Sequence, residues 1–551
     1  MKIAIIGNYA TQFFHKSLLR KLKKNHSDIQ MYQSEFNTID IELLDIHSGL
    51  FQFEPDYIIW HESTLGLRDT FYQSITENRV EFALNYQARI EGYLNTISIN
   101  LPGTKVIFPN HGINFDDKVF GNFSLKVESS WMFQRNKINT SINQLALQFS
   151  NFYPMESQPS TNELVVTDYS MVVNAELHFS PDYLDWLSES VLKTIEAFRG
   201  QFKKCIILDL DNTLWGGIIG DDGLENIHIG TLGIGKAFTR LQKWLKELKN
   251  RGIILAVCSK NNEDIAKSAF EQHPEMVLKL EDIAVFMANW NSKADNINQI
   301  QKILNIGFDS MVFIDDNPAE REIVRTHIPK ILVPELPLDP ADYLPFLISQ
   351  NIFETVSYSN NDSERTRQYQ EESKRVAFSQ SITNMDDYLL SLNMRAVISN
   401  FQSFDIERIA QLSQRSNQFN LRTKRYSIQD IENIMNNENY LTFSVHLHDK
   451  FGSYGLISMV IVKIEENTAF IDTWIMSCRV LKRTVEHLLM NLIVSKLIER
   501  KIDIIKGEYL PTDKNMLVEH LLSELAMDKL DEHNYQLKIS KYIPLKHFIN
   551  Y

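Results

Sequence analysis

A chain of 551 residues has room for about three or four domains, and its net charge of −14 argues against general nucleic-acid binding. Its three cysteines provide neither a disulfide framework nor metal-ligand spacing, and free thiols suit a reducing cytosol. The start, Met1–Asn8, lacks the length of a signal peptide, and no run approaches the roughly 20 apolar residues of a membrane span. We therefore expect a cytoplasmic protein that binds neither nucleic acid nor membranes.

Residues 1–190 have the pattern of an α/β layer domain, with helical segments between predicted strands at Met1–Gly7, Tyr57–Trp60 and Thr104–Phe108. The region resembles the SGNH hydrolases, which need a nucleophilic serine after the first strand. Gly7–Thr11 contains no serine, and His61, His111 and Asp168 make no triad without one. We expect a non-hydrolytic domain that docks a partner or shapes a tunnel.

The apolar run Cys205–Leu208 leads directly into Asp209, Asp211 and Thr213. Residues i and i+2 of a strand share a face, so both carboxylates should emerge together where the strand ends. Like charges held this close need a cation or a shared proton. A strand followed by an Asp- and Asn-rich turn would also give this pattern. The buried strand before the motif and the threonine after it resemble motif I of the haloacid-dehalogenase-like (HAD) phosphotransferases.

Three further segments of residues 195–350 supply what phosphoryl transfer requires. The strand pattern Gly252–Cys258 ends at Ser259, Asn289–Lys293 delivers an ammonium group, and the strand pattern Met311–Ile314 ends at Asp315 and Asp316. Ser259 could merely cap a helix, Lys293 could be a surface lysine, and the aspartate pair could be a turn. Their order, with helical patterns between them, favours a parallel sheet that binds ligand beyond its C-terminal strand ends.

The resemblance to the HAD enzymes implies catalytic and metal-binding roles. Asp209 would be the nucleophile that forms an aspartyl-phosphate, and Asp211 would protonate the leaving oxygen. The Asp209 carboxylate, the Asp211 backbone carbonyl and a carboxylate of Asp315 or Asp316 would hold Mg²⁺, because hard oxygen ligands suit Mg²⁺ better than zinc. Of the last two, Asp316 matches the acid in the family's pattern.

The same resemblance assigns the phosphate. Thr213 and Ser259 would orient it, and Lys293 would neutralise its charge. HAD enzymes that act on small metabolites often insert a cap domain after motif I or before the motif lysine, and both gaps are too short for one here. An uncapped site is open, so we expect a large or protein-borne substrate.

A narrower resemblance comes from several blocks of sequence. They are 209–217 (Asp-Leu-Asp-Asn-Thr-Leu-Trp-Gly-Gly), 257–261, 289–293, 313–317, 416–423, 449–456 and 476–481. Together they look like the FkbH-like family. The resemblance implies that the protein takes a phosphoglyceryl group from 1,3-bisphosphoglycerate, dephosphorylates it, and loads it on the phosphopantetheine thiol of an acyl carrier protein. The pathway would be polyketide-type or related biosynthesis.

Such chemistry implies a cysteine nucleophile in its thiolate form. Cys205 lies inside an apolar run and is expected in the core. Cys258 precedes Ser259, although strand alternation turns it away from the serine side. Cys478 follows a strand pattern and precedes Arg479 and a helix, which would lower its pKa. We favour Cys478 slightly over Cys258, and a plain core role for both remains open.

Residues 351–380 are predicted as a linker and helix, and 381–551 as an α+β domain. Predicted strands at Leu441–His448, Ile457–Ile464 and Thr468–Met476 precede a long helix, Arg483–Arg500. This order resembles the GNAT acyltransferases. The pyrophosphate loop of that fold has two glycines, and both are replaced in Arg479–Thr484. Close approach of the pyrophosphate of coenzyme A is then hindered. Either the loop binds the single phosphate of a carrier protein's phosphopantetheine, or the domain keeps the fold without catalytic activity.

The residues leave three functions open. One is the carrier-loading enzyme; a second is a Mg²⁺-dependent HAD phosphatase that acts on another phosphorylated metabolite or tethered intermediate, with flanking domains for recognition. A third is a scaffold with a decayed site, which the complete set of acidic residues argues against.

Overall fold

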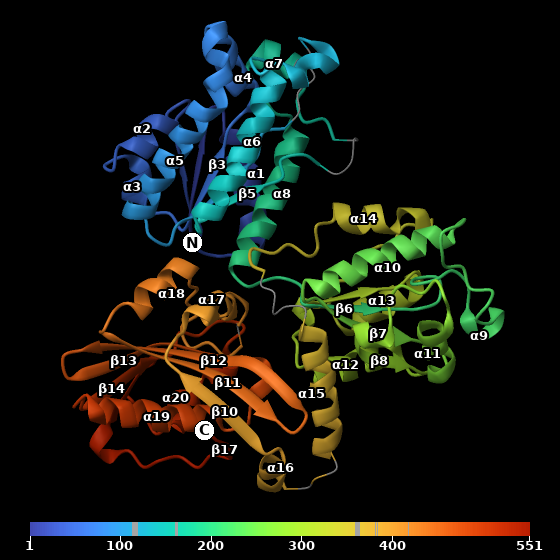
Figure 1. Ribbon diagram of the computed structural model, residues 1–551, viewed down its shortest axis with the longest axis vertical. Coiled ribbons are helices and arrows are strands. Elements are labelled where there is room, and N and C mark those ends of the chain that lie inside the picture. The colour runs from blue at the N-terminus through green and yellow to red at the C-terminus, as the bar shows by residue number, and fades with distance from the viewer. Residues whose placement is uncertain (113–118, 160–163, 359–363, 381, 383, 417) are drawn as a thin grey trace. The chain divides into compact units, whose positions relative to one another are not determined.

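The computed structural model describes residues 1–112, 119–159, 164–358, 364–380, 382, 384–416 and 418–551. The chain divides into two compact units, Met1–Ile195 and Glu196–Tyr551 (Figure 1).

The first unit is built on a five-stranded sheet in the order β2-β1-β3-β4-β5, in which every neighbouring pair is parallel. Its strands are β1 (Lys2–Gly7), β2 (Gln30–Gln33), β3 (Tyr57–His61), β4 (Lys105–Pro109) and β5 (Phe152–Met155). The central strands are buried on both faces, which explains their unbroken apolar sequences.

The α-helices in the described residues of this part of the chain are α1 (Gln12–Asn25), α2 (Ile39–Leu44), α3 (Gly49–Phe53), α4 (Thr64–Gln73), α5 (Phe82–Asn100), α6 (Trp131–Gln148), α7 (Tyr169–Ala175) and α8 (Pro181–Phe198). Trp60 and Phe108 of the sheet pack with Trp131 of α6 in one core. Because the strands are parallel, their C-terminal ends all lie at the same edge of the sheet.

The second unit begins with a four-stranded parallel sheet in the order β8-β7-β6-β9. The strands are β6 (Cys205–Leu208), β7 (Ile254–Ser259), β8 (Ile283–Ala288) and β9 (Met311–Ile314). The helices are α9 (Ile219–Asp222), α10 (Gly235–Asn250), α11 (Glu263–Gln272), α12 (Lys293–Leu304), α13 (Pro318–His327) and α14 (Tyr343–Ser349). Between Asp209 and Lys293, a fully described segment, these short elements leave no room for an inserted cap domain.

An eight-stranded mixed sheet follows, in the order β15-β16-β14-β13-β12-β11-β10-β17. The strands are β10 (Met394–Ser399), β11 (Tyr440–Asp449), β12 (Gly452–Glu465), β13 (Thr468–Met476), β14 (Ile504–Glu508), β15 (Asp528–Lys529), β16 (Asn534–Lys538) and β17 (Ile549–Asn550). Neighbouring strands are antiparallel except β13–β14 and β10–β17. The three predicted strands of this region match β11, β12 and β13.

The remaining helices are α15 (Arg365–Gln380), α16 (Met385–Ser391), α17 (Ile406–Arg415), α18 (Ile428–Met435), α19 (Val485–Glu499) and α20 (Leu521–Glu524). Helix α19 connects β13 to the parallel strand β14. Its side chains Leu488, Ile493 and Leu497 are buried in the core of this domain. The predicted fold class, a multidomain protein with two parallel α/β sheets and an α+β domain, is confirmed.

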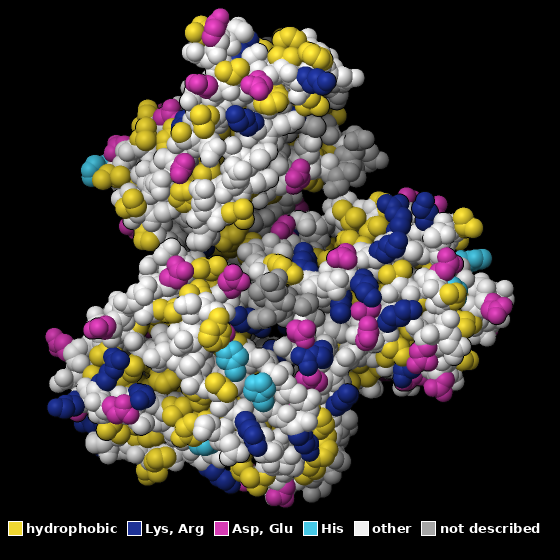
Figure 2. Space-filling model, in the orientation of Figure 1, with side chains coloured by type: hydrophobic (Ala, Val, Ile, Leu, Met, Phe, Trp, Pro, Cys, Tyr) yellow, Lys and Arg dark blue, Asp and Glu magenta, His cyan; other side chains and the backbone are white. Residues whose placement is uncertain are grey.

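On the face drawn in Figure 2, Lys and Arg side chains alternate with Asp and Glu. Within the described residues, the helices are too short or too polar to cross a bilayer.

Candidate active site

The C-terminal ends of β6, β7 and β9 bring the predicted motif residues to one edge of the four-stranded sheet. The backbone N–H of Asp209, directly after β6, donates to the carbonyl of Ile314 at 3.0 Å. Asn212 then takes a left-handed backbone with φ of 54°, and its side-chain oxygen accepts from the N–H of Gly217 at 2.9 Å. This turn folds the segment after motif I back over the strand end.

Three carboxylates meet at this edge. One oxygen from each of Asp209, Asp315 and Asp316 lies within 4.8 Å of the others. The Nζ of Lys293 lies 2.8 Å from Asp209 Oδ2 and 2.5 Å from Asp315 Oδ2. Lys293 is only 3% exposed, so the alternative of a solvated surface lysine is wrong.

The cluster is electrostatically strained. Burial raises the pKa of Asp315 and Asp316, and the charge of Asp209 raises both further. Burial opposes the charge of Lys293, but Asp209 and Asp315 outweigh it and raise the pKa of Lys293. A single ammonium group therefore faces a cluster of three carboxylates, and this edge of the sheet carries an excess of negative charge.

A divalent cation fits this deficit. The Oδ1 atom of Asp209 is buried and has no hydrogen-bond partner among the described residues, which is costly unless a ligand fills the position. The donors are hard oxygens, the set that Mg²⁺ prefers. Asp209, Asp316 and the backbone carbonyl of Asp211 could hold such an ion, with Asp315 nearer to Lys293.

Asp211 points elsewhere. Its Oδ1 accepts from Trp215 Nε1 at 2.9 Å and from the N–H of Ile219 at 3.0 Å. Its Oδ2 accepts from Asn261 Nδ2 at 3.0 Å. Burial raises the pKa of Asp211, although these two Oδ1 donors oppose the shift. A carboxyl group held in place with a raised pKa can serve as a general acid.

Asn261 was not predicted as a site residue. It lies in the bend after β7, two positions past Ser259, where the alternation of the strand no longer applies. Ser259 itself ends β7 and is buried. The hydroxyl of Thr213 donates to Asp316 Oδ1 and accepts from the Asp316 N–H, both at 3.1 Å. Thr213 thus positions a candidate metal ligand, and its contact with phosphate stays a prediction.

The structure places two of the three cysteines in the core. Cys258 is fully buried, its Sγ lies 3.7 Å from the carbonyl of Lys293, and burial raises the pKa of its thiol. Burial also raises the pKa of Cys205, which faces the same core. Burial of both side chains favours the plain core role for Cys258 over that of a nucleophile. The side chain of Cys478, the favoured candidate, lies outside the described residues.

The loop before α19 keeps an unusual backbone. Lys482 and Thr484 have φ of 62° and 61°, the left-handed conformation that glycine adopts without strain. Arg483, between them, is buried and pairs with Glu372 of α15 at 2.9 Å. The loop thus follows a glycine-like path without the two glycines that a pyrophosphate loop would have.

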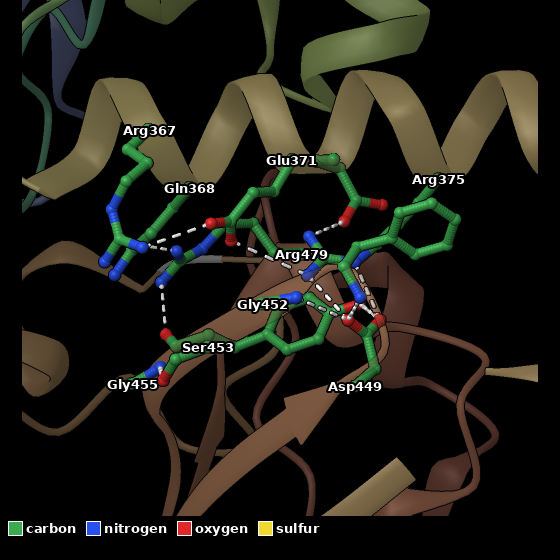
Figure 3. Close-up of polar contacts among 12 residues, drawn as sticks. Arg367, Gln368, Glu371, Arg375, Asp449, Gly452, Ser453, Gly455 and Arg479 are labelled. Atoms are coloured by element: carbon green, nitrogen blue, oxygen red, sulfur yellow. Dashed lines mark hydrogen bonds and ion pairs between the residues drawn. The ribbon is translucent and has the colours of Figure 1, made fainter. Parts of the chain in front are cut away.

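Figure 3 shows the buried arginine that fixes α15 to the mixed sheet. Arg375 is 1% exposed, and its Nε and Nη2 donate to Asp449 at 2.7 and 2.9 Å. Its guanidinium lies 3.9 Å from the ring centre of Tyr454, whose hydroxyl also donates to Asp449. Helix α15 is therefore part of the second unit's packed structure, and the region predicted as linker and helix contains this helix.

The polar residues singled out in the first unit make hydrogen bonds to different partners. His61 Nδ1 lies 2.7 Å from the hydroxyl of Tyr9, and His111 Nε2 lies 3.0 Å from that of Tyr86. Asp168 accepts from the first turn of α7 as its N-terminal cap. These three residues have separate partners.

The comparisons with known proteins agree with this site. Residues 2–196 match the family model described as FkbH, N-terminal domain. A solved structure, the N-terminal part of the protein BF1531 from Bacteroides fragilis containing a phosphatase domain complexed with Mg, is 44% identical. The match covers 65% of this chain and 94% of that one, with a TM-score of 0.62. Fold and site thus define a protein with a HAD-like phosphatase domain. The chain belongs to the FkbH-like family.

Two acetyltransferases also match a smaller part. The ribosomal-protein-S18-alanine N-acetyltransferase from Escherichia coli is 16% identical over 28% of this chain and 99% of its own, with a TM-score of 0.21. A spermidine N-acetyltransferase from Vibrio cholerae is 14% identical over 27% and 97%, with a TM-score of 0.22. Among curated proteins, no match was found.

Proposed function

We propose that the second unit transfers a phosphoryl group to Asp209 and then to water. The observation that carries this proposal is the unpartnered, buried Oδ1 of Asp209 beside Lys293 and two further carboxylates. A bound Mg²⁺ would neutralise charge that develops on the phosphate oxygens. Asp209 attacks phosphorus, Lys293 holds the phosphate oxygens, and Asp211 gives its proton to the leaving oxygen.

We further propose the substrate of this site. Membership of the FkbH-like family supports a phosphoglyceryl group from 1,3-bisphosphoglycerate that is dephosphorylated and loaded on a carrier-protein thiol. The absence of an inserted domain between Asp209 and Lys293 supports a substrate tethered to a macromolecule. Because Cys258 is sealed in the core, Cys478 and the carrier's phosphopantetheine are the thiols that remain to carry the acyl group.

The test is a loading assay with the full chain, Mg²⁺, 1,3-bisphosphoglycerate and candidate carrier proteins, read by intact mass. The wild-type protein should give a glyceryl adduct on the carrier. Asp209→Asn should leave phosphate on the adduct or stop loading, because the phosphorylated aspartate cannot form. The loading proposal would be overturned if neither the glyceryl adduct nor its phosphorylated form appeared on any carrier.

The second candidate is a phosphatase for another phosphorylated metabolite, favoured by the similarity to the Bacteroides fragilis protein, which contains a phosphatase domain. It predicts phosphate release from small esters without any carrier, again lost in Asp209→Asn. Release without loading would select this function over the first.

A further inference from the structure

A serine and a histidine meet in a pocket of the first unit. Ser63 follows β3, and its Oγ lies 2.7 Å from Nδ1 of His178. Both residues line the pocket, which opens at the C-terminal edge of the sheet beside Asn110 and Ser157. Ser63 is buried except toward this pocket. The pair is far in sequence and is brought together only by the fold.

When the proton of the neutral imidazole is on Nε2, His178 Nδ1 accepts the hydrogen bond from the Ser63 hydroxyl. Ser63 caps α4, and its Oγ accepts from the N–H of Gly66 at 3.3 Å. The hydroxyl proton is then available for His178. Burial lowers the pKa of His178, so its imidazole is neutral and can accept that proton. This is the arrangement of a nucleophile and its base.

The first turn of α4 adds hydrogen-bond donors. Thr64 and Leu65 line the same pocket, and their N–H groups are the first two of a ten-residue helix, which have no partner within it. Asn8 fixes the backbone of Ser63, since its Oδ1 accepts from the Ser63 N–H at 2.6 Å. Donors at a helix start are suited to an oxyanion that forms beside the serine.

We propose that Ser63 and His178 form an acyl-transfer site that takes small esters or thioesters. Ser63 Oγ attacks the carbonyl carbon while its proton passes to His178, and the oxyanion is bound by the N–H groups of Thr64 and Leu65. When the intermediate collapses, the bond to the alcohol or thiol breaks, and that group leaves with the proton from His178. Water, activated by His178, then releases the acid and restores Ser63. The pocket is small, which limits the acyl group to a short one.

This activity is separate from the phosphatase of the second unit. It also revises the prediction of a non-hydrolytic first domain, which rested on the lack of a serine after the first strand. The serine comes from the third strand instead, where a segment reading His61-Glu62-Ser63 gave no motif.

The experiment treats the full chain with diisopropyl fluorophosphate, which reacts with activated serines, and maps the adduct by peptide mass. One adduct at Ser63 is expected, and Ser63→Ala should remove it. His178→Gln should slow labelling about 100-fold, the usual contribution of a general base. Hydrolysis of p-nitrophenyl acetate should fall in parallel in both variants.

The matched control is Ser130→Ala. Ser130 is also a buried serine that caps a helix, accepting from the N–H of Phe133 at 3.2 Å, but its hydroxyl donates to a backbone carbonyl. Ser130→Ala should label at the wild-type rate. The proposal is overturned if Ser63 takes up no label, or if the His178→Gln protein, shown folded by its thermal transition, labels as fast as wild type.

Discussion

At the scale of single residues, the most informative group is Asp211, because three donors from different segments hold its carboxylate. Two of them, Trp215 and Ile219, follow it closely in the chain, and Asn261 comes from the next strand end. A general acid must stay aimed at the leaving oxygen through each turnover. Asn261 is therefore a positioning residue for the proposed phosphatase.

Replacing Asn261 tests that role. Asn261→Leu should lower kcat for a phosphate ester about 10- to 100-fold. Because the amide stabilises the charged carboxylate, its loss should raise the pKa of Asp211 and move the alkaline limb of the kcat profile to higher pH. A pH profile measures both effects.

The neighbouring Asn262 gives the control. It caps α11 by accepting from the N–H groups of Asp264 and Ile265. Asn262→Ala should cost about 1 kcal/mol of stability and leave the pH profile in place. A profile that moves equally in both variants would argue against a specific role for Asn261.

Asp316 gives a test of the metal. Its raised pKa means that its charge opposes folding, and this cost grows as pH rises above the ordinary value for an aspartate. Asp316→Asn should therefore raise the Tm of the metal-free protein at neutral pH. It should also abolish the increase in Tm that Mg²⁺ gives the wild type, which corresponds to a stabilisation of about 2.7 kcal/mol at 100 times Kd.

The charge-matched control is Asp295→Asn, at an exposed position in the first turn of α12. This variant should keep the full Mg²⁺ response in differential scanning fluorimetry. An Asp316→Asn protein that still gains Tm with Mg²⁺ would show that the cation binds elsewhere.

The sequence identified the ends of the strands but not the contacts between them. The positions of Asp209, Lys293, Asp315 and Asp316 followed from motif order, since parallel strands deliver their ends to one edge. The bond from Asn261 to Asp211 depends on how two strands pair, and local pattern does not record it. The burial of Cys258 was suggested by strand alternation, and the structure now gives its pKa direction.

At the scale of secondary-structure elements, the buried ion pair between Arg375 and Asp449 joins α15 to the mixed sheet. Burial works against the charge of Asp449, but Arg375 outweighs it and lowers the pKa of that carboxyl. The stability that results is present above the ordinary aspartate pKa and is lost as pH falls through the lowered one. Arg375 also fills space against Tyr454.

A double-mutant cycle measures this pair. Arg375→Met should cost about 3–5 kcal/mol, because it leaves a buried carboxylate without its cation. Arg375→Met combined with Asp449→Asn should recover part of that loss. The free energies of unfolding are measured in urea at neutral pH. If the change in the double variant equals the sum of the changes in the two single variants, Arg375 and Asp449 are not coupled.

The missed elements have physical explanations. In the first unit, the pattern predicted three strands, which became β1, β3 and β4. Strand β2 is polar and partly exposed, and β5 contains Pro154, so neither shows a buried apolar run. Both are edge strands, where proline and polar residues are tolerated.

At the scale of the whole molecule, the two units have separate hydrophobic cores. Each unit exceeds the size at which a single chain can bury a stable core. The units should therefore unfold as distinct cooperative blocks.

Differential scanning calorimetry of the full chain should show at least two transitions. Mg²⁺ should raise only the one that belongs to Glu196–Tyr551, because the carboxylate cluster lies in that unit. The same transition should dominate in a fragment of residues 196–551. A single transition, or equal shifts in both, would contradict independent units.

The left-handed residues before α19 offer an opportunity for protein engineering. A non-glycine residue in this conformation costs about 1–2 kcal/mol, and the chain bears that cost at both Lys482 and Thr484. Glycine at position 482 would fit the same path and remove a side chain from the start of the helix. The loop thus bears a backbone cost that glycine would relieve.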